Sequence, residues 1–497
     1  MMRLFLRKLI LTFTILNVAV SVQADVIIKG TIVHNVANLD IKNICFEVYQ
    51  DYISPQVNQS KKILCSVDSK GYFSTTIKGY KNAFYIGTYF VSSTNKEVFA
   101  LDNQVLHKPF LFEDNDSLNI TINLRGKWIQ FKGKGSERLN CQFQMESQSI
   151  SEGGLARVRD LGNKENFYDA NALESKLLDQ LWVSKLTILQ SYKNNFSPYI
   201  YNRVYLDSWY YQKYSHLNSL LSTYALTYPI RNKGIIDFVK TKYSNDLQIP
   251  EGINPSSEML GQYIRYLYKS NYLKLIIGKF DLGNLTYNVS MLELFQKIKN
   301  NYSGPTRDYL FLTFFLTGGK YQNDTLAFLE EAKKLITLTA VKDELAMWLN
   351  RLNTFDKQNF TLTDIDGKTV SLNNLKGKVL VLDFWFLGCS GCLKMSPYLE
   401  KVQNYFENRD VVFVSINTDD LPRFKLGLED GGYTNPNQLL LYTSGLVRQH
   451  PLLEYFKIYD FPTLIVIKKN GEAVSSRAPD PRLDNGLALK KMIESAF

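Results

Sequence analysis

The most informative stretch of the sequence is residues 379–397, VLVLDFWFLGCSGCLKMSP. Its beginning, Val379 to Phe384, is apolar except for one aspartate and predicts a buried strand. The CSGC motif, from Cys389 to Cys392, follows where the pattern becomes helical. A helix N-terminus carries partial positive charge and unpaired N–H groups, which stabilise a thiolate and lower the pKa of a cysteine. We therefore predict Cys389 as a nucleophile and Cys392, one turn inside the helix, as the resolving thiol.

Three features around the motif strengthen this interpretation. Asp383 lies near the end of the apolar strand, where a carboxylate is costly unless it has a function or is satisfied by backbone donors. Pro397 lies five residues after Cys392, where it would kink the helix. Far downstream, Phe461-Pro462-Thr463 runs directly into an apolar strand at 464–467, and a proline in that position is consistent with a cis bond in a tight turn.

Together, residues 356–497 resemble the thioredoxin superfamily, and specifically its exported TlpA/ResA-like branch. A β-hairpin at 360–372, F-W-x-x-x-C-x-x-C, the helix proline and the Phe-Pro-Thr step occur in the family's order. The resemblance implies an α/β thioredoxin fold in which the first cysteine attacks a substrate disulfide and the second resolves the mixed disulfide. The site residues that it implies are catalytic Cys389, Cys392 and Asp383, the last exchanging a proton with the second cysteine, and the substrate-groove residues Pro462, Phe461 and Trp385.

The sequence departs from the family pattern at three positions. Gly388 stands where a tryptophan usually precedes the first cysteine, and Gly391 replaces the common proline inside the motif. Met395 stands where many relatives carry an acidic residue. We expect a more flexible Ser-Gly loop. The direction of electron flow stays open, because the redox potential depends on thiolate stabilisation and loop strain.

Other chemistries of a C-x-x-C pair fit less well. Zinc half-sites share this spacing, but no second cysteine pair exists. The four histidines, His34, His107, His216 and His450, are not spaced to complete a metal site, and neither a metal nor an organic cofactor is expected. Peroxiredoxins share the fold and place a threonine three residues before the reactive cysteine, where this chain has Phe386. A thiol peroxidase is therefore a weaker hypothesis.

Residues 1–24 predict a secretory signal peptide. A basic start with Arg3, Arg7 and Lys8 precedes an apolar stretch, and a small-residue cleavage site ends at Ala24. An uncleaved anchor is the alternative. We expect export to a Gram-negative periplasm, where disulfides persist. The formal net charge of +10 is spread along 497 residues without a basic block, which argues against a nucleic-acid partner.

The remaining chain predicts two further domains, giving a multidomain protein. Residues 25–135 contain short strands separated by turn signals and suggest an all-β, sandwich-like domain. The expected strands are 26–33, 44–49, 63–67, 72–77, 84–91 and 118–124. Cys45 and Cys65 could meet in a hairpin centred near Pro55, but their alternation with apolar neighbours places them on opposite faces, so a disulfide would require a slip or bulge.

Residues 136–355 change to helical periodicity and predict an α-helical domain. Aromatic residues around Trp209, Tyr210, Tyr211 and Tyr214 could form a ligand platform, but at helical spacing they are more typical of a core. In the last domain, His450 opens a helical pattern and is expected to be structural rather than a base. Asp419 and Asp420 are expected in a solvated loop or as helix caps.

These observations predict a periplasmic thiol–disulfide oxidoreductase that reduces protein disulfides through Cys389 and Cys392. Its partners would be disulfide-containing protein substrates and a membrane or periplasmic thiol that donates electrons. The main alternative is a binding module whose N-terminal domains capture a partner, with the C-terminal domain acting as a redox sensor or scaffold. The sequence does not choose an oligomeric state.

Overall fold

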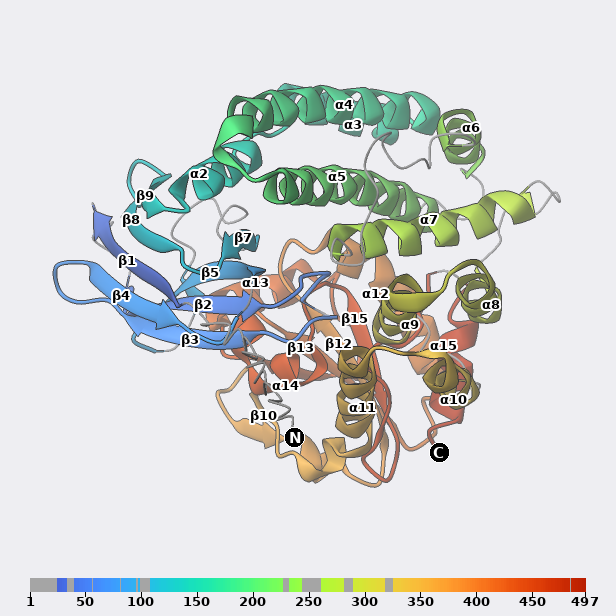
Figure 1. The fold of residues 1–497 in the computed structure, drawn as a ribbon. Helices are drawn as coiled ribbons and strands as arrows, with labels where there is room; N and C mark the ends of the chain where they lie inside the picture. Colours follow the sequence, from blue (N-terminus) through green and yellow to red (C-terminus); the bar gives the residue numbers. More distant parts are fainter. Residues whose placement is uncertain are drawn as a thin grey trace, which may run out of the picture.

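The chain forms a β-sheet region, a helical region and a C-terminal α/β domain, in that order (Figure 1). The predicted signal peptide, residues 1–24, lies outside the described residues. This computed structural model describes residues 25–33, 40–55, 57–80, 82–94, 97–98, 108–226, 232–243, 261–280, 289–317, 325–482 and 484–497.

The β region is built from two sheets that share one core. One sheet has the strand order β4-β1-β8-β9, and the other has the order β3-β2-β5-β6, with β7 also pairing with β5. Phe46 of the second sheet and Phe73 and Ile120 of the first are buried in the same cluster, so the sheets pack face to face. The strands are β1 (Val26–Val33), β2 (Asn43–Tyr49), β3 (Lys61–Ser66), β4 (Tyr72–Ile77), β5 (Ala83–Val91), β6 (Glu97–Val98), β7 (Phe110–Glu113), β8 (Ser117–Asn123) and β9 (Trp128–Lys134).

Cys45 and Cys65 lie on adjacent strands but face opposite sides of their sheet. In the antiparallel ladder of β2 and β3, Cys45 is opposite Leu64 and Cys65 is opposite Ile44. Side chains alternate along a strand, so this register separates the two sulfur atoms. No disulfide joins them, as the alternation of the sequence indicated.

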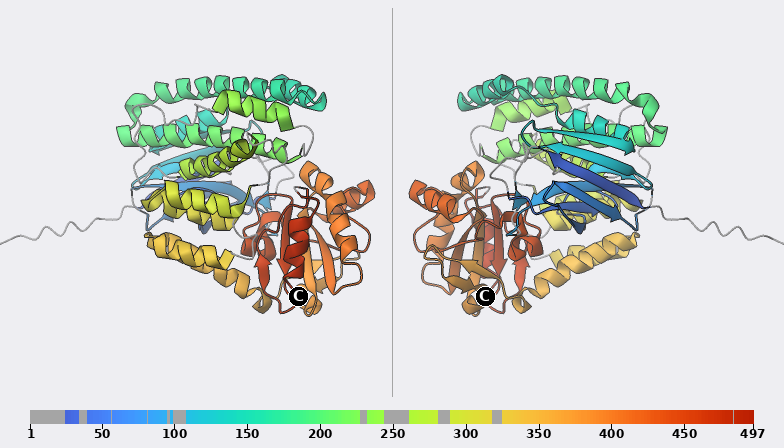
Figure 2. Two further views of the ribbon diagram at one scale, coloured as in Figure 1. Left: turned by 90° about the vertical axis from the view of Figure 1, so that its right-hand side faces the viewer. Right: turned by 90° about the vertical axis from the view of Figure 1, so that its left-hand side faces the viewer.

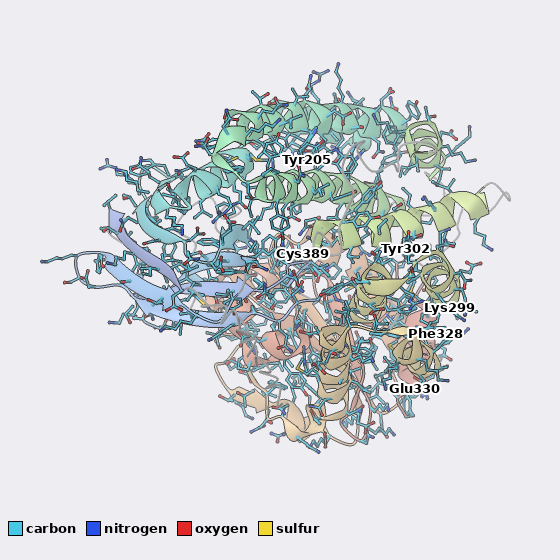
Figure 3. The ribbon with its side chains drawn as sticks, viewed as in Figure 1. Tyr205, Lys299, Tyr302, Phe328, Glu330 and Cys389 are labelled. Atoms are coloured by element: carbon cyan, nitrogen blue, oxygen red, sulfur yellow. A yellow bond between two sulfur atoms is a disulfide. The ribbon has the colours of Figure 1, made fainter. Side chains whose placement is uncertain are left out.

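The helical region stacks long helices against each other above the C-terminal domain (Figure 1). Phe295 stacks on Phe311 and Phe328 in its core, and Figure 3 labels Phe328. Tyr210 belongs to the same buried cluster, and Trp209 packs against this cluster, which confirms the core interpretation of that aromatic group. The helices are α2 (Ser136–Glu146), α3 (Glu152–Asn163), α4 (Phe167–Ser191), α5 (Pro198–Leu226), α6 (Asn232–Tyr243), α7 (Gly261–Phe280), α8 (Met291–Asn301), α9 (Gly304–Thr317), α10 (Thr325–Leu335) and α11 (Thr339–Asn353), with short 3-10 turns η1 (Lys193–Asn195) and η3 (Phe355–Lys357).

The C-terminal domain contains a seven-stranded sheet with the order β11-β10-β14-β13-β12-β15-β16. Its central strands β12, β13 and β14 are parallel, and β15 runs antiparallel to β12. The strands are β10 (Thr361–Thr363), β11 (Thr369–Ser371), β12 (Val379–Trp385), β13 (Val411–Asn417), β14 (Leu439–Tyr442), β15 (Thr463–Ile467) and β16 (Ala473–Ser475). The helical segments are η4 (Leu372–Leu375), α12 (Ser390–Tyr405), α13 (Leu421–Asp430), η5 (Val447–Gln449), α14 (Pro451–Phe456) and α15 (Leu487–Glu494).

The two faces of strand β12 enter different cores. Val379 and Val381 face a cluster that contains Leu399 of α12 and Leu489 of α15. Residues at the alternate positions, such as Leu382, belong to a cluster that continues through α14 and α11 into the helical region. Figure 2 shows the C-terminal domain lying to one side of the sandwich and the helices. One continuous apolar core therefore joins this domain to the helical region.

Polar contacts also fix the β2–β3 hairpin against the C-terminal domain. Lys62 of β3 forms an ion pair with Glu454 of α14. Lys457, directly after α14, donates from Nζ to the backbone carbonyl of Asn58 at 3.2 Å. No described helix is long and apolar enough to cross a membrane.

Candidate active site

The two motif cysteines form a disulfide at the beginning of α12, with Cα atoms 5.3 Å apart. Cys389 is the residue that caps the helix, and its Sγ accepts the backbone N–H of Cys392 at 3.1 Å. Both cysteines are nearly buried, with 5% and 3% of their surfaces exposed. Figure 3 labels Cys389. The predicted strand–turn–helix context of the motif is therefore present, and the helix N-terminus is aimed at the sulfur of Cys389.

A glycine shapes the turn that precedes the disulfide. Gly388 has φ of +100°, a conformation that residues with a Cβ rarely adopt. Its N–H donates to the hydroxyl of Tyr433 at 2.8 Å, and the Tyr433 ring stacks on Trp385 with centroids 4.8 Å apart. The departure from the family's usual tryptophan at this position therefore has a structural reason: this backbone requires glycine.

Trp385 does not line a groove, contrary to the sequence expectation. Its side chain is fully buried, and Nε1 donates to the hydroxyl of Ser415 on the neighbouring strand at 2.7 Å. It belongs to the cluster that contains both motif cysteines. Trp385 is therefore a core residue that packs in the same cluster as the disulfide. Its indole N–H is hydrogen-bonded inside the domain and not at the surface.

Two residues after β13 hold the loop in front of the cysteines. Asp419 accepts the backbone N–H of Leu387 at 2.7 Å and pairs with Arg423 Nε at 3.0 Å. Arg423 Nη2 donates to the carbonyl of Leu387 at 2.8 Å. The expectation that Asp419 lies in a solvated loop is wrong, since only 13% of its side chain is exposed. Asp420 caps α13, which confirms the capping interpretation for that residue.

The Phe461–Pro462 peptide bond is cis, as the Phe-Pro-Thr step indicated. Pro462 lies against the motif loop, because a Cβ built on Gly391 would lie only 3.0 Å from Pro462 Cδ. The Phe461 ring meets Phe386 edge to face at 5.4 Å. The structure thus brings Pro462 and Phe461 to the disulfide. Phe386, where a peroxiredoxin would carry threonine, is packed in this aromatic contact.

Asp383 is a buried carboxylate in an apolar part of β12. It shares the strand face of Val379 and Val381, the face that α12 covers. Its Oδ1 has no hydrogen-bond partner among the described residues, so the alternative of an aspartate fully satisfied by backbone donors does not hold. Burial raises the pKa of Asp383 from 3.8 to about 7, because the ionised form loses its hydration without gaining a counter-charge.

An arginine from a distant part of the chain contacts the motif loop. Arg482 Nη1 donates to the carbonyl of Gly391 at 3.2 Å. The same guanidinium pairs with Asp480, with Nε 2.9 Å from Oδ1. Sequence reasoning missed Arg482 and Tyr433, since neither has a local spacing signal. The flexibility expected of the Ser-Gly loop stays a prediction.

His450 has a structural place, as expected. Its Nδ1 accepts the N–H of Leu452 at the start of α14, and Nε2 lies 3.1 Å from the carbonyl oxygen of Thr361. Burial lowers the pKa of His450. In the part of the chain that the structure describes, no group of three or more His, Cys, Asp or Glu side chains could hold a metal ion.

A dithiol pair at a helix N-terminus, beside a cis-proline, with a buried carboxylate on the strand face that this helix covers, defines a thiol–disulfide exchange site on a thioredoxin-like sheet. Residues 354–476 match the family model described as Redoxin. The C-terminal domain is therefore a redoxin domain, and its expected resemblance to the thioredoxin superfamily is confirmed.

Individual relatives are similar to the same part of the chain. The thiol-disulfide oxidoreductase ResA of Halalkalibacterium halodurans is 28% identical over 120 residues, covering 23% of this chain and 62% of the relative. ResA of Bacillus subtilis is 37% identical over 65 residues, covering 13% and 36%. The chain thus spans less than two thirds of the length of these curated relatives. A solved thioredoxin domain of a Bacteroides vulgatus thiol-disulfide oxidoreductase is 33% identical, with 28% of this chain and 92% of that domain covered and a TM-score of 0.23.

Proposed function

We propose that the protein is a thiol–disulfide oxidoreductase that reduces protein disulfides. The observation that carries this proposal is the placement of the Cys389–Cys392 pair at the beginning of α12, against Pro462. The match to the Redoxin family and the similarity to ResA proteins support the same chemistry.

The reaction begins with reduced cysteines. The Cys389 thiolate attacks one sulfur of a substrate disulfide, and the other substrate sulfur leaves as a thiolate. Cys392 then attacks the Cys389 sulfur of the mixed disulfide, which releases the second substrate thiol and forms the Cys389–Cys392 disulfide. Two electrons pass to the substrate. A thiol donor restores the dithiol by the reverse exchange.

Asp383 supplies a proton acceptor near the second cysteine in this scheme. A carboxyl group with a pKa of about 7 is close to the operating pH and can accept the proton of Cys392 as that thiol attacks. It returns the proton when the disulfide is reduced again. No described residue donates a hydrogen bond to its Oδ1, so this oxygen is available to accept the proton.

The periplasm is the proposed location, and the basic and apolar pattern of residues 1–24 supports it. A disulfide-exchange enzyme fits that compartment, since protein disulfides persist there. The proposed partners are disulfide-containing proteins and a thiol donor at the membrane or in the periplasm.

Reduction of insulin by the full chain, with dithiothreitol as the electron source, tests this proposal. Cys389→Ser should lower the rate to the level of dithiothreitol alone. The matched control is Cys65→Ser, because a serine there can keep the contact of the Cys65 sulfur with the Ser74 carbonyl at 3.2 Å. If the unmodified protein reduces insulin no faster than dithiothreitol alone, the alternative of a binding module, with the C-terminal domain as a redox sensor or scaffold, is favoured.

A further inference from the structure

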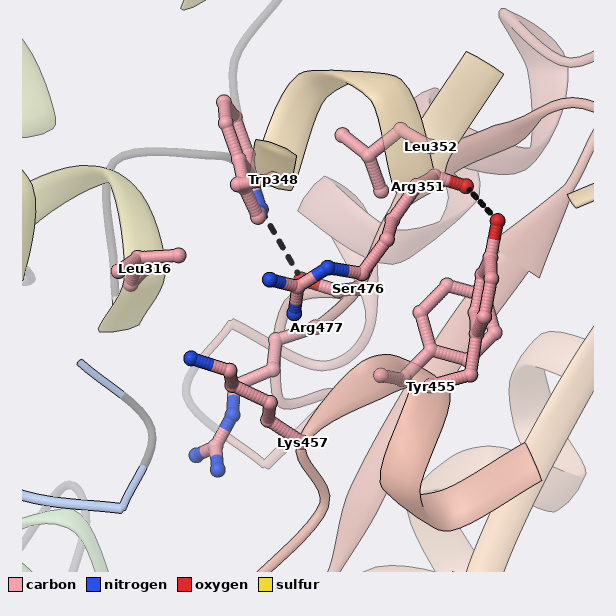
Figure 4. A pocket seen from close by; sticks show the side chains of 9 residues that line it. Leu316, Trp348, Arg351, Leu352, Tyr455, Lys457, Ser476 and Arg477 are labelled. Atoms are coloured by element: carbon pink, nitrogen blue, oxygen red, sulfur yellow. Dashed lines mark hydrogen bonds between the residues drawn. The ribbon is translucent and has the colours of Figure 1, made fainter. Parts of the chain in front are cut away.

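A small cavity lies where the helical region meets the C-terminal domain (Figure 4). Its walls come from the end of α9, from α11, from the end of α14 and from the residues that follow β16. Its volume of about 20 Å³ is enough for one water-sized group. Arg351, Lys457 and Arg477 are the charged residues that line it, and Trp348 and Leu352 contribute apolar walls.

The guanidinium of Arg351 enters this cavity, and the carboxylate that acts on it electrostatically is Glu344. The Arg351 backbone carbonyl accepts the hydroxyl of Tyr455 at 2.7 Å, but no described residue forms a hydrogen bond or ion pair with the Arg351 side chain. Lys457, on the opposite wall, is 3.8 Å from Glu344 Oε2, which is a loose ion pair. Arg351 and Lys457 thus share the Glu344 carboxylate, with Glu47 a weaker influence on Lys457, so the positive charge at the cavity is only partly offset.

The surroundings make this excess charge unfavourable. Arg351 and Lys457 are both partly buried, and burial together with the neighbouring Arg351 charge lowers the pKa of Lys457 to about 8 despite Glu344. Burial also lowers the pKa of Arg351. Two half-buried cations that share one ion-pairing carboxylate lose more hydration than that carboxylate replaces. An anion would repay that loss, and a guanidinium fork matches the two oxygens of a carboxylate or phosphate.

We propose that this junction cavity is a binding site for an oxyanion, either a small free anion such as phosphate or a carboxylate presented by a partner polypeptide. Arg351 is the principal ligand, and Lys457 adds charge from the opposite wall. One oxygen of the anion fills the cavity and the rest lies at its mouth. The site is separate from the cysteines and does not require their chemistry.

An anion bound at this site would also affect the groove beside the disulfide. Arg477 lines the same cavity and pairs with Asp460, with Nη1 2.6 Å from Oδ2. Asp460 lies two residues before Pro462, so an anion within reach of Arg477 competes with the Asp460 carboxylate. This consequence rests on the proposed function, whereas the binding site itself does not.

Thermal unfolding of the oxidised full chain in increasing phosphate, at constant ionic strength set with sodium chloride, tests the site. Phosphate should raise the Tm of the unmodified protein, and Arg351→Gln should weaken the apparent affinity by about tenfold or more. The matched control is Arg157→Gln, an exposed arginine on α3, which should respond like the unmodified protein. Arg351→Lys keeps the charge without the fork and should be intermediate.

A second arm uses a fluorescently labelled acidic peptide with a free C-terminal carboxylate. If phosphate raises the Tm and this increase is lost in Arg351→Gln only, the ligand is a small free anion. If only the peptide binds, with the same loss, the ligand is a partner's carboxylate. If neither ligand distinguishes Arg351→Gln from Arg157→Gln, the proposal is overturned. Because the Arg351 side chain forms no hydrogen bond or close ion pair with a described residue, Arg351→Gln should fold with little change in Tm in the absence of ligand, and Cys389→Ser should bind normally.

Discussion

Replacing Asp383 with asparagine should remove a loss of stability that the unmodified protein suffers as the pH rises. The folded-state pKa of about 7 lies above the ordinary value of 3.8, so the folded chain holds the proton more tightly than the unfolded chain. Below pH 3.8 both states are protonated and nothing is lost. Between about pH 4 and pH 7 the unfolded state releases its proton first, and stability falls until the folded state is also ionised.

The size of this effect follows from the shift. Three pKa units correspond to about 4 kcal/mol in the free energy of unfolding, of which about 2 kcal/mol falls between pH 5 and pH 7. Asparagine carries no titrating proton, so this part of the pH dependence should disappear. The difference in the free energy of unfolding between Asp383→Asn and the unmodified protein should therefore be a few kcal/mol more favourable to Asp383→Asn at pH 8 than at pH 5.

Urea unfolding of the oxidised protein at pH 5 and pH 8 measures the difference. The intact Cys389–Cys392 disulfide keeps the two active-site thiols out of the titration. Asp430→Asn, at an exposed position on α13, makes the same chemical change where burial contributes nothing. If Asp383→Asn and Asp430→Asn show the same pH dependence as the unmodified protein, the argument that Asp383 is held protonated by burial is refuted.

Three further outcomes are expected. Cys392→Ser should accumulate a mixed disulfide between Cys389 and a substrate, seen as a reducible adduct by mass spectrometry; its absence would contradict the order of attack. Gly391→Ala should slow insulin reduction several-fold and lower the stability by about 1 kcal/mol, because its Cβ would approach Pro462 Cδ to 3.0 Å; rates and urea midpoints equal to those of the unmodified protein would show that the loop yields freely. Arg482→Gln should shift the redox potential, measured against glutathione, because the Gly391 carbonyl loses a charged donor; an unchanged potential would limit Arg482 to a structural role.

The parts of the site that the sequence predicted are those encoded locally. Cys389, Cys392 and Asp383 belong to one strand–turn–helix segment, so their order along the chain already determines their placement. Pro462 was found because a proline directly before an apolar strand has few conformations open to it.

The parts that could not be predicted depend on long-range packing. Tyr433 reaches Gly388 across 45 residues, and Arg482 reaches Gly391 across 91 residues. No spacing rule links such positions. Trp385 was misplaced for a related reason: the buried hydroxyl of Ser415, which accepts its indole N–H, becomes visible only when β12 and β13 are paired.

In the β region, strands with a clear apolar alternation were predicted, and β1 and β4 have the expected bounds. Strands β6, β7 and β9 were missed. β6 has only two residues and β7 only four, which is too short for a period to be recognised. β9 has the sequence WIQFKGK, in which a glycine and two lysines weaken the strand signal.

The continuous core between the helical region and the C-terminal sheet determines how, under the proposed function, a donor and a substrate can reach the cysteines. A redox domain on a loose tether can swing from its donor to its substrate and present the same cysteines to each in a different place. Here α11, α14 and the β2–β3 hairpin hold the domain in one orientation. In the proposed reaction, donor and substrate therefore reach the same cysteines in one fixed orientation, each leaving before the other docks. Steady-state rates should then follow ping-pong kinetics, with each partner inhibiting competitively against the other at high concentration.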